Sequence, residues 1–437
     1  MNELAQKLAQ YLKRDDPEID YRIENGIETN RKGFGEISLV DAAGKPVPSA
    51  DITLKHMRHE FQFGCNAFML EQFPSAEQNA RYEELFRDLF NLAVVPLYWS
   101  DLEPKDGHLR FAKTTEPIYR RPQPDLCLEF CEKNRITPKG HPLLWHLFRP
   151  EWLSDDNAVM ERRIRQRFRE IADRYAGRIK IWDVCNEAQT MAIGTRQHVM
   201  PENHVELAFT LAAQYFPDCV RTYNDDRMWY HFSKSYSPVY LLVKSLLDRG
   251  YAVNALGLQY HMFEGQLQYA SQFMNPVYLF RILDQYAKLG LPINFSEVSI
   301  ISRRDLGDGD EFQRFVTEKL YRLWFSHPAV NGATWWNLVD GTAAFAPLGS
   351  EHGENSLRAG LVNFDMTPKP AYLAIQNLIK KQWRTDTGLA YQQGAVNKFR
   401  GFFGEYEVKI KAGAQTFTRS LQLSKGNLNL FRFVLNE

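Results

Sequence analysis

The sequence lacks the features that mark nucleic-acid-binding, membrane-spanning and secreted chains. Its 53 basic and 53 acidic residues leave no net charge, so there is no basic surface to attract nucleic acid or anionic lipid. No stretch approaches the roughly 20 apolar residues of a membrane span. The first residues also lack the basic and apolar regions of a signal peptide. We therefore expect no nucleic-acid and no membrane partner, and a cytoplasmic protein if Met1 is the native start, or a secreted one if a signal peptide was removed.

Cysteine is scarce, and the motifs of cofactor and metal sites are missing. The five cysteines are an odd number and include no Cys-x-x-Cys pair, which argues against a disulfide framework and a zinc knuckle. We expect reduced, mostly buried thiols. No Gly-x-Gly-x-x-Gly turn follows an early strand, so a doubly wound dinucleotide-binding sheet remains only the alternative fold. Without His-x-His or His-Glu-x-x-His spacing, the sequence predicts neither a metal nor a cofactor.

Aromatic residues are plentiful and make up 13% of the 437 residues. The share of apolar residues, 44%, is ordinary for a globular protein. Such a content suits a protein that stacks its rings on flat ligands. The length indicates two or three domains, or one large barrel with additions.

Both ends of the chain alternate apolar and polar residues, which is typical of half-buried strands. A polar, helical lead covers residues 1 to about 30, and the alternating segments Phe34–Val40 and Asp51–Lys55 flank a turn, which predicts a β-hairpin. Short alternating runs return near the C-terminus. The predicted domains are 1–60, the N-terminal helix and strands of an accessory β-module; 61–383, a catalytic barrel; and 384–437, the C-terminal strands that complete the module.

The region between the two ends alternates helical and extended segments. Apolar residues in Tyr82–Phe90 and in Ile164–Tyr175 recur with helical spacing, and a short apolar run follows each. Eight such runs are the predicted strands, namely Phe61–Gly64, Leu92–Val95, Ile136–Gly140, Ile179–Val184, Cys219–Tyr223, Ala255–Gln259, Pro292–Ser296 and Gly332–Trp335. This pattern predicts an α/β fold, a (β/α)8 TIM barrel, with a small β-sandwich-like module formed by the N- and C-terminal segments.

Polar and aromatic residues stand at the carboxyl ends of these strands, where a barrel carries its chemistry. They are His141–His146, Asn186 and Glu187, Gln259–His261, Glu297, and Trp336–Asn337. Two carboxylates on opposite strands, Glu187 and Glu297, suit a retaining glycosidase. One carboxyl group gives a proton to the glycosidic oxygen, and the other attacks the anomeric carbon from about 5–5.5 Å away from the first.

Several motifs in the same order resemble glycoside hydrolase family 10, whose commonest activity is endo-β-1,4-xylanase. The segment Trp182–Ala188 resembles the acid/base signature of the family, Gly140–His146 its Gly-His-Thr-Leu-Val-Trp-His segment, and Gly257–His261 its Gly-Leu-Gln-Ser-His. The resemblance runs from about residue 61 to Tyr372. It implies a retaining β-glycoside hydrolase that acts on a xylan-type or related decorated β-glycan or oligosaccharide by double displacement.

The resemblance also implies roles for the matching residues. Glu187 is the implied general acid/base and Glu297 the implied nucleophile. The implied substrate-binding or supporting residues are Asn186 on the sugar 2-hydroxyl, His261 as the hydrogen-bond partner that keeps Glu297 ionised, His141 and Trp145 beside the sugar before the scissile bond, Trp336 as the floor, and Gln259 and Asn224. We expect Trp335 to point into packing and His146 to be a buried residue that supports a loop.

The sequence departs from the family pattern on the glycone side. The second strand of the family usually ends in Glu-Asn-x-x-Lys-Trp, and aligning its Trp on Trp99 places Val94, Val95 and Tyr98 at the three polar positions. Ser299 replaces an Asp that helps organise the site in the family. We therefore expect a reshaped glycone pocket that favours a decorated or non-xylan β-glycoside over plain xylan.

Two alternatives remain open at this point. One is a carbohydrate-binding pseudo-enzyme, and the other is a barrel glycosidase of non-xylan specificity, such as a β-glucanase or an enzyme that cleaves a glycoside of a plant secondary metabolite. The expected partner in each case is a β-linked oligosaccharide or polysaccharide. The oligomeric state and the choice between endo and exo action are left open.

Overall fold

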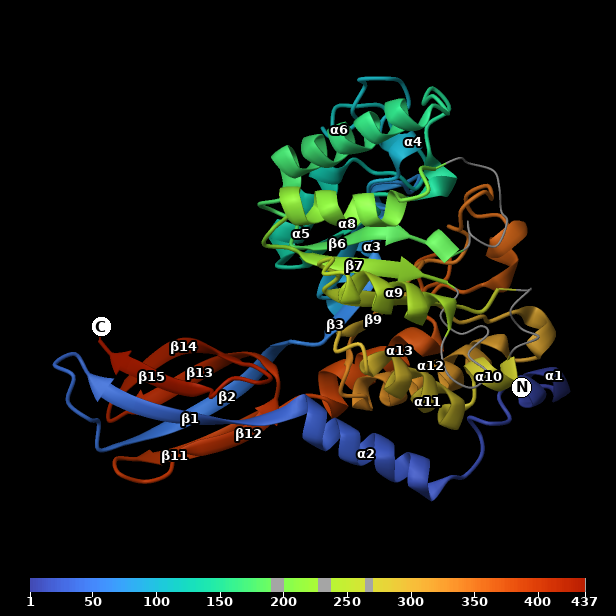
Figure 1. Ribbon diagram of the computed structural model, residues 1–437. Helices are drawn as coiled ribbons and strands as arrows, with labels where there is room; N and C mark the ends of the chain where they lie inside the picture. The colour runs from blue at the N-terminus through green and yellow to red at the C-terminus, as the bar shows by residue number, and fades with distance from the viewer. Residues whose placement is uncertain (190–199, 227–236, 264–269, 437) are drawn as a thin grey trace.

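Eight parallel strands close into a barrel in the computed structural model of the chain (Figure 1). The structure describes residues 1–189, 200–226, 237–263 and 270–436. The barrel strands are β3 (Gln62–Asn66), β4 (Leu92–Pro96), β5 (Thr137–His141), β6 (Ile181–Asn186), β7 (Val220–Asp225), β8 (Ala255–His261), β9 (Ile293–Ser299) and β10 (Val330–Trp335). They follow one another in chain order, and β10 pairs with β3 to close the ring. The predicted (β/α)8 barrel and its eight strand segments are confirmed.

Helices that follow the barrel strands along the chain cover the outside of the barrel. They include α3 (Ala76–Leu89), α4 (Trp99–Leu102), α5 (Pro124–Asn134), α6 (Asn157–Tyr175), α8 (His204–Tyr215), α9 (Pro238–Asp248), α10 (Ala270–Phe273), α11 (Pro276–Ala287), α12 (Gly309–Ser326) and α13 (Pro370–Asn377). Shorter turns are η1 (His146–Phe148), η3 (Arg304–Leu306), η4 (Gly353–Leu357) and η5 (Leu378–Gln382).

The two helices that the periodicity predicted begin at side-chain caps and bury the predicted face. The side chains of Ser75 and Asp156 accept hydrogen bonds from the first turns of α3 and α6, which satisfies backbone N–H groups that have no partner within the helix. Tyr82 on α3 and Ile164 on α6 then lie in the barrel core. Local sequence therefore fixes where each helix begins and which face it turns inward.

The terminal strands form a second unit of two sheets, which we call the β-module. One sheet has the order β12-β1-β15, made of β12 (Lys398–Phe402), β1 (Lys32–Asp41) and β15 (Leu430–Leu435). The other has the order β11-β2-β13-β14, made of β11 (Asp386–Gln392), β2 (Ser49–His59), β13 (Gly404–Ala412) and β14 (Gln415–Leu423). Their apolar faces share one core that includes Leu39, Leu54 and Val408.

The predicted hairpin of the two N-terminal strands is wrong. Strands β1 and β2 lie in different sheets of the β-module, and each pairs with C-terminal strands instead. The reason is that each strand has one apolar face, and the two faces pack against each other across the sandwich. Alternation identified the buried faces but carries no information about the pairing partner.

The β-module lies at the end of the barrel where the strands begin, because β2 runs almost directly into β3 (Figure 1). The N-terminal helices α1 (Glu3–Leu8) and α2 (Pro17–Arg31) precede the module in sequence, yet their apolar residues pack into the barrel core. The division of the chain at residues 60 and 383 stays a proposal.

All five cysteines are free and buried, as predicted. Of the helices that the structure describes, none is both long and apolar enough to cross a membrane.

Candidate active site

The carboxyl ends of the barrel strands open into a cavity of about 170 Å³, which we call the active-site cavity. Six of the residues singled out in the sequence line it, namely Trp145, Glu187, Gln259, His261, Glu297 and Trp336. The other three, His141, Asn186 and Asn224, are buried directly behind the lining residues. The barrel thus brings Trp145 and Trp336 into the same cavity, although they are more than 190 positions apart in the sequence.

Glu187 stands immediately after β6 in a left-handed backbone conformation, with φ of +54°. Side chains other than glycine rarely adopt this region, and such strain persists where the surroundings fix it. Its Oε1 accepts hydrogen bonds from Asn186 Nδ2 at 3.2 Å and from Gln259 Nε2 at 2.9 Å. Burial, with added repulsion from Asp226 and Glu297, raises the pKa of Glu187 well above its ordinary value. This environment favours the protonated carboxyl group.

Glu297 lies in β9 and is buried among hydrogen-bond donors. Its Oε1 accepts a hydrogen bond from Asn224 Nδ2 at 2.9 Å, and its Oε2 lies 3.1 Å from His261 Nε2. Each carboxylate oxygen therefore has an N–H partner. The hydrogen bond expected between His261 and Glu297 is present.

Two asparagines connect the two carboxyl groups. Nδ2 of Asn224 donates to Oδ1 of Asn186 at 2.7 Å as well as to Glu297, and Asn186 donates to Glu187. The hydroxyl of Ser296 donates to Oδ1 of Asn224. The side-chain amides of Asn186 and Asn224 each have more than one hydrogen-bond partner. One hydrogen-bond network therefore positions the two carboxyl groups relative to each other.

His261 is held from its other side by Ser299. Nδ1 of His261 lies 2.9 Å from Oγ of Ser299, and Nε2 faces Glu297. A carboxylate only accepts, so Nε2–H donates to Glu297, and Nδ1 of a neutral imidazole accepts from the Ser299 hydroxyl. A neutral residue thus fills the position where the family pattern has an acidic one.

Aromatic rings form one wall of the active-site cavity. Trp145, Phe148 and Tyr98 contact one another at ring distances of 4.5 to 5.7 Å, and Trp336 lies edge-on to His141 at 5.7 Å. Flat rings of this kind are suited to the C–H faces of sugars. The neighbouring Trp335 is fully buried and donates to the carbonyl oxygen of Ala359, as expected for a residue that points into packing.

The polar positions that the family pattern places at the end of the second barrel strand are apolar here. Val94 and Tyr98 are buried in a small cluster with Phe68 and Leu92, and the aromatic wall packs against this cluster. Val95 is buried in the barrel core. His146 is buried as well, and His141 is bound to Asp183 at 2.9 Å.

Sequence reasoning missed several residues of the cavity. They are Arg120, Arg121, Phe148, Phe263 and Glu354. None belongs to a motif, and they come from loops whose sequences show no periodicity, so no sequence signal marks them. Only the closed barrel places these loops at the mouth of the cavity.

The described residues contain no cluster of three or more His, Cys, Asp or Glu side chains arranged to hold a metal ion.

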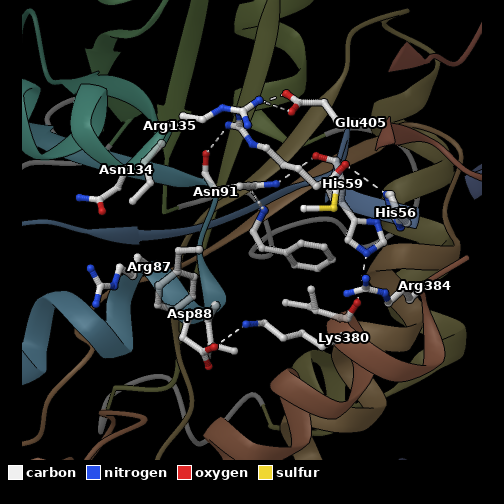
Figure 2. Close-up of a pocket in the computed structure, with 17 residues that line it drawn as sticks. His56, His59, Arg87, Asp88, Asn91, Asn134, Arg135, Lys380, Arg384 and Glu405 are labelled. Carbon is white, nitrogen blue, oxygen red and sulfur yellow. Dashed lines mark hydrogen bonds and ion pairs between the residues drawn. The ribbon is translucent and has the colours of Figure 1, made fainter. Parts of the chain in front are cut away.

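A second cavity, of about 330 Å³, lies at the opposite end of the barrel where the β-module meets it (Figure 2). Its charged side chains form ion pairs, of which that between Glu405 and Arg135 joins the β-module to the barrel. Glu405 of the module pairs with Arg58 and Arg135, and Lys380 pairs with Asp88. These charges compensate one another, so we interpret this cavity as a polar junction between the barrel and the β-module. Glu187 and Glu297 lie at the opposite end of the barrel.

Comparison with known proteins identifies a family and the same fold. Residues 55–378 match the model of Glycosyl hydrolase family 10. Endo-1,4-beta-xylanase B of Thermotoga neapolitana is 25% identical over 346 residues, which cover 76% of this chain and 93% of that protein. Endo-1,4-beta-xylanase 2 of Arabidopsis thaliana is 26% identical over 390 residues, which cover 86% of this chain and 32% of that protein. The crystal structure of xylanase 10B from Thermotoga maritima aligns with a TM-score of 0.60 at 24% identity and covers 74% of this chain and 96% of that one.

Proposed function

This chain belongs to glycosyl hydrolase family 10, and from that premise we propose that it hydrolyses a xylan-type or related decorated β-glycan by double displacement, with Glu187 as general acid/base and Glu297 as nucleophile. The observation that carries the proposal is the difference between the two carboxyl environments. Glu187 has a raised pKa and suits a proton donor, whereas Glu297 faces two N–H donors and suits an ionised nucleophile.

In the first step, a carboxylate oxygen of Glu297 forms a bond to the anomeric carbon while the bond to the glycosidic oxygen breaks. Glu187 gives its proton to that oxygen, and the leaving sugar departs as a neutral alcohol. In the second step, Glu187 takes a proton from water, the water oxygen bonds to the anomeric carbon, and Glu297 is released as a carboxylate. Two inversions at the same carbon retain its configuration.

The remaining residues of the site support these steps. Asn186 donates its amide N–H to Glu187, and we assign to it the binding of the sugar 2-hydroxyl. Asn224 and His261 hold Glu297, and Gln259 holds Glu187. Trp145 stands beside the sugar before the scissile bond and Trp336 is its floor, while His141 is buried behind them and supports Trp336.

Retention is tested by following the first-formed product by NMR. Hydrolysis of an aryl β-xylobioside should yield the β-anomer first, which then mutarotates. An α-anomer as the first product would remove Glu297 from the nucleophile role, because a single displacement inverts the anomeric carbon.

The two roles are separated by leaving groups of different acidity. Glu187→Ala should slow hydrolysis most for substrates with poor leaving groups, since an acidic aryl alcohol departs without a proton, whereas Glu297→Ala should abolish turnover of both kinds. Equal losses of Glu187→Ala on activated and unactivated glycosides would contradict the acid assignment. A chain that binds oligosaccharides but turns over none of them would be a binding protein rather than an enzyme.

The glycone specificity is the finer part of the proposal. Loss of the three polar partners at Val94, Val95 and Tyr98 removes one net hydrogen bond at each position, on the order of 1 kcal/mol apiece, so plain xylose should be held weakly there. We expect kcat/KM to be higher on branched oligosaccharides than on xylotetraose or undecorated xylan. A clear preference for undecorated xylan would contradict this expectation.

A further inference from the structure

Arg120 brings a positive charge to the active-site cavity that the proposed mechanism does not use. It lines the cavity together with Glu187 and Glu297, and only 2% of the residue is exposed. Burial lowers the pKa of Arg120 to about 10, so the guanidinium is still protonated at neutral pH. A buried cation needs compensation from an anion or from a full set of hydrogen bonds.

The contacts of Arg120 within the described residues supply only part of that compensation, which includes the ring of Phe68, whose centroid lies 5.4 Å from the guanidinium carbon. Nη1 donates to Oδ1 of Asn337 at 2.7 Å and to the carbonyl oxygen of Thr342. Nε is buried without a hydrogen-bond acceptor. In the part of the chain that the structure describes, no carboxylate lies within ion-pair distance of this guanidinium, and both of its hydrogen bonds leave from the same nitrogen.

The backbone of Arg120 is also held in an unusual state, with φ of +60° in the left-handed region. A residue with a side chain adopts this conformation at a cost in free energy, and such residues cluster at binding and catalytic sites. The arginine side chain is therefore held at the cavity against both backbone preference and desolvation.

The neighbouring Arg121 shows which side of the cavity the pair occupies. Its guanidinium lies 3.6 Å from the ring centroid of Tyr98, and its Nε donates to Asp101 at 2.7 Å. Tyr98 contacts Trp145 and His141. The arginines thus stand on the side of the aromatic wall, where the three polar positions of the second strand have been lost. Arg121 forms an ion pair with Asp101, whereas Arg120 forms no ion pair with any residue that the structure describes.

We propose that Arg120 binds the carboxylate of a uronic acid residue in the substrate, on the side of the scissile bond that Tyr98 and Trp145 line. Arginine presents N–H groups in a fixed fork that matches a carboxylate, and a charge-assisted pair of this kind is stronger than a neutral hydrogen bond. The inference rests on the proposed function and narrows its substrate class to acidic oligosaccharides.

The acidic residues of the cavity are compatible with such a substrate. Burial raises the pKa of Glu354 as well as that of Glu187, which favours the uncharged form of both carboxyl groups. Glu297 is turned toward Asn224 and His261. The substrate carboxylate then meets Arg120, with the adjacent Arg121 adding to the positive potential.

The test compares two ligands that differ in one group. One is xylotriose with a glucuronic acid branch on its non-reducing xylose, and the other is the same compound with the branch carboxyl reduced to the alcohol. Binding to Glu187→Gln, which arrests turnover, is measured by calorimetry. We expect the acidic ligand to bind roughly tenfold or more tightly than the reduced one, and Glu187→Gln/Arg120→Gln to lose this difference.

Arg432→Gln, an exposed arginine of the β-module, is the matched control and should keep the preference. If Arg120→Gln does not fold, as judged by circular dichroism, Arg120→Lys keeps the charge without the fork and should lose part of the preference. Equal affinity of the two ligands, absence of binding by both, or an unchanged preference in the Arg120 variants would overturn the inference. Hydrolysis of a neutral aryl xylobioside by the unaltered chain tests the proposed function separately.

Discussion

At the scale of single residues, Glu187 departs from ordinary behaviour in its backbone, its contacts and its pKa. Its backbone is left-handed, two amides bind one of its oxygens, and burial raises its pKa well above the ordinary value. Perturbed carboxyl groups in clefts are typical of catalytic acids, because a general acid works best when its pKa approaches the working pH.

The raised pKa predicts how activity depends on pH. Turnover of a glycoside with a poor leaving group should fall as the pH rises through the pKa of Glu187, because the carboxyl group then no longer carries the proton that the leaving oxygen needs. Turnover of an aryl glycoside with an acidic leaving group should fall much less over the same range. The measurement is kcat against pH for both substrates, and superimposable profiles would contradict the prediction.

The same shift predicts a gain in stability when the charge is removed. A carboxyl group with a raised pKa keeps its proton in the folded state at pH values where the unfolded chain has lost it. Stability therefore declines as the pH rises from the ordinary carboxyl pKa to the raised one. Glu187→Gln removes this penalty, so its Tm should exceed that of the unaltered chain by a few degrees near pH 8, and by less near pH 5.

The control for this stability prediction is Glu151→Gln, an exposed glutamate outside the cavity. Its Tm should track that of the unaltered chain at both pH values. A Tm of Glu187→Gln that is unchanged, or that rises by the same amount at both pH values, would contradict the linkage argument.

At the scale of elements, the hydrogen-bond network depends on how closely β7 and β8 approach. A Cβ on Gly257 of β8 would lie 2.1 Å from Oδ1 of Asn224 on β7. Asn224 is the residue that connects Asn186 with Glu297. The absence of a side chain at this strand position therefore allows the amide to sit between the two carboxyl groups.

Gly257→Ala should displace Asn224 and reduce kcat by roughly tenfold or more, because a shift of about 1 Å in a positioning group lowers the rate by orders of magnitude. Gly388→Ala in β11 is the matched control, since the nearest atom to its Cβ is 3.7 Å away. The measurement is kcat on an aryl xylobioside together with Tm. Equal effects of the two substitutions on kcat would contradict this account.

At the scale of the whole molecule, the N-terminal segment joins the barrel to the β-module. Helix α2 runs along the barrel beside α12 and leads directly into β1 of the module (Figure 1). Its last residue, Arg31, is buried and donates to the carbonyl oxygens of Phe325, His327 and Val330 at the end of α12 and the start of β10. Burial lowers the pKa of Arg31 to about 9.

Arg31→Ala should lower the free energy of unfolding by about 3 kcal/mol, because three buried carbonyl groups lose a charged donor. Urea unfolding followed by tryptophan fluorescence measures the change. Arg14→Ala, at an exposed arginine of the N-terminal lead, is the control and should be neutral. KM of the folded Arg31 variant should be unchanged, since the residue lies outside the active-site cavity, and an altered KM would show coupling between this junction and the site.

The sequence by itself determined the barrel and the neighbourhood of its two carboxyl groups. Each barrel strand is a short apolar run between helical stripes, and each of these patterns is local, so the chain reveals them without any knowledge of pairing. Parallel strands present their carboxyl ends at one face, so residues such as Glu187 and Glu297 that follow different strands must meet there. Their chemical roles remain proposals.

Tertiary structure alone decided the features that depend on contacts between distant segments. Strands β1 and β2 pair with C-terminal strands in two sheets, since alternation specifies a buried face but not a partner. Helix α2 packs on the barrel although it precedes the β-module. Arg120 reaches the active-site cavity from a loop without any motif, because loop position follows from chain closure around the barrel rather than from local periodicity.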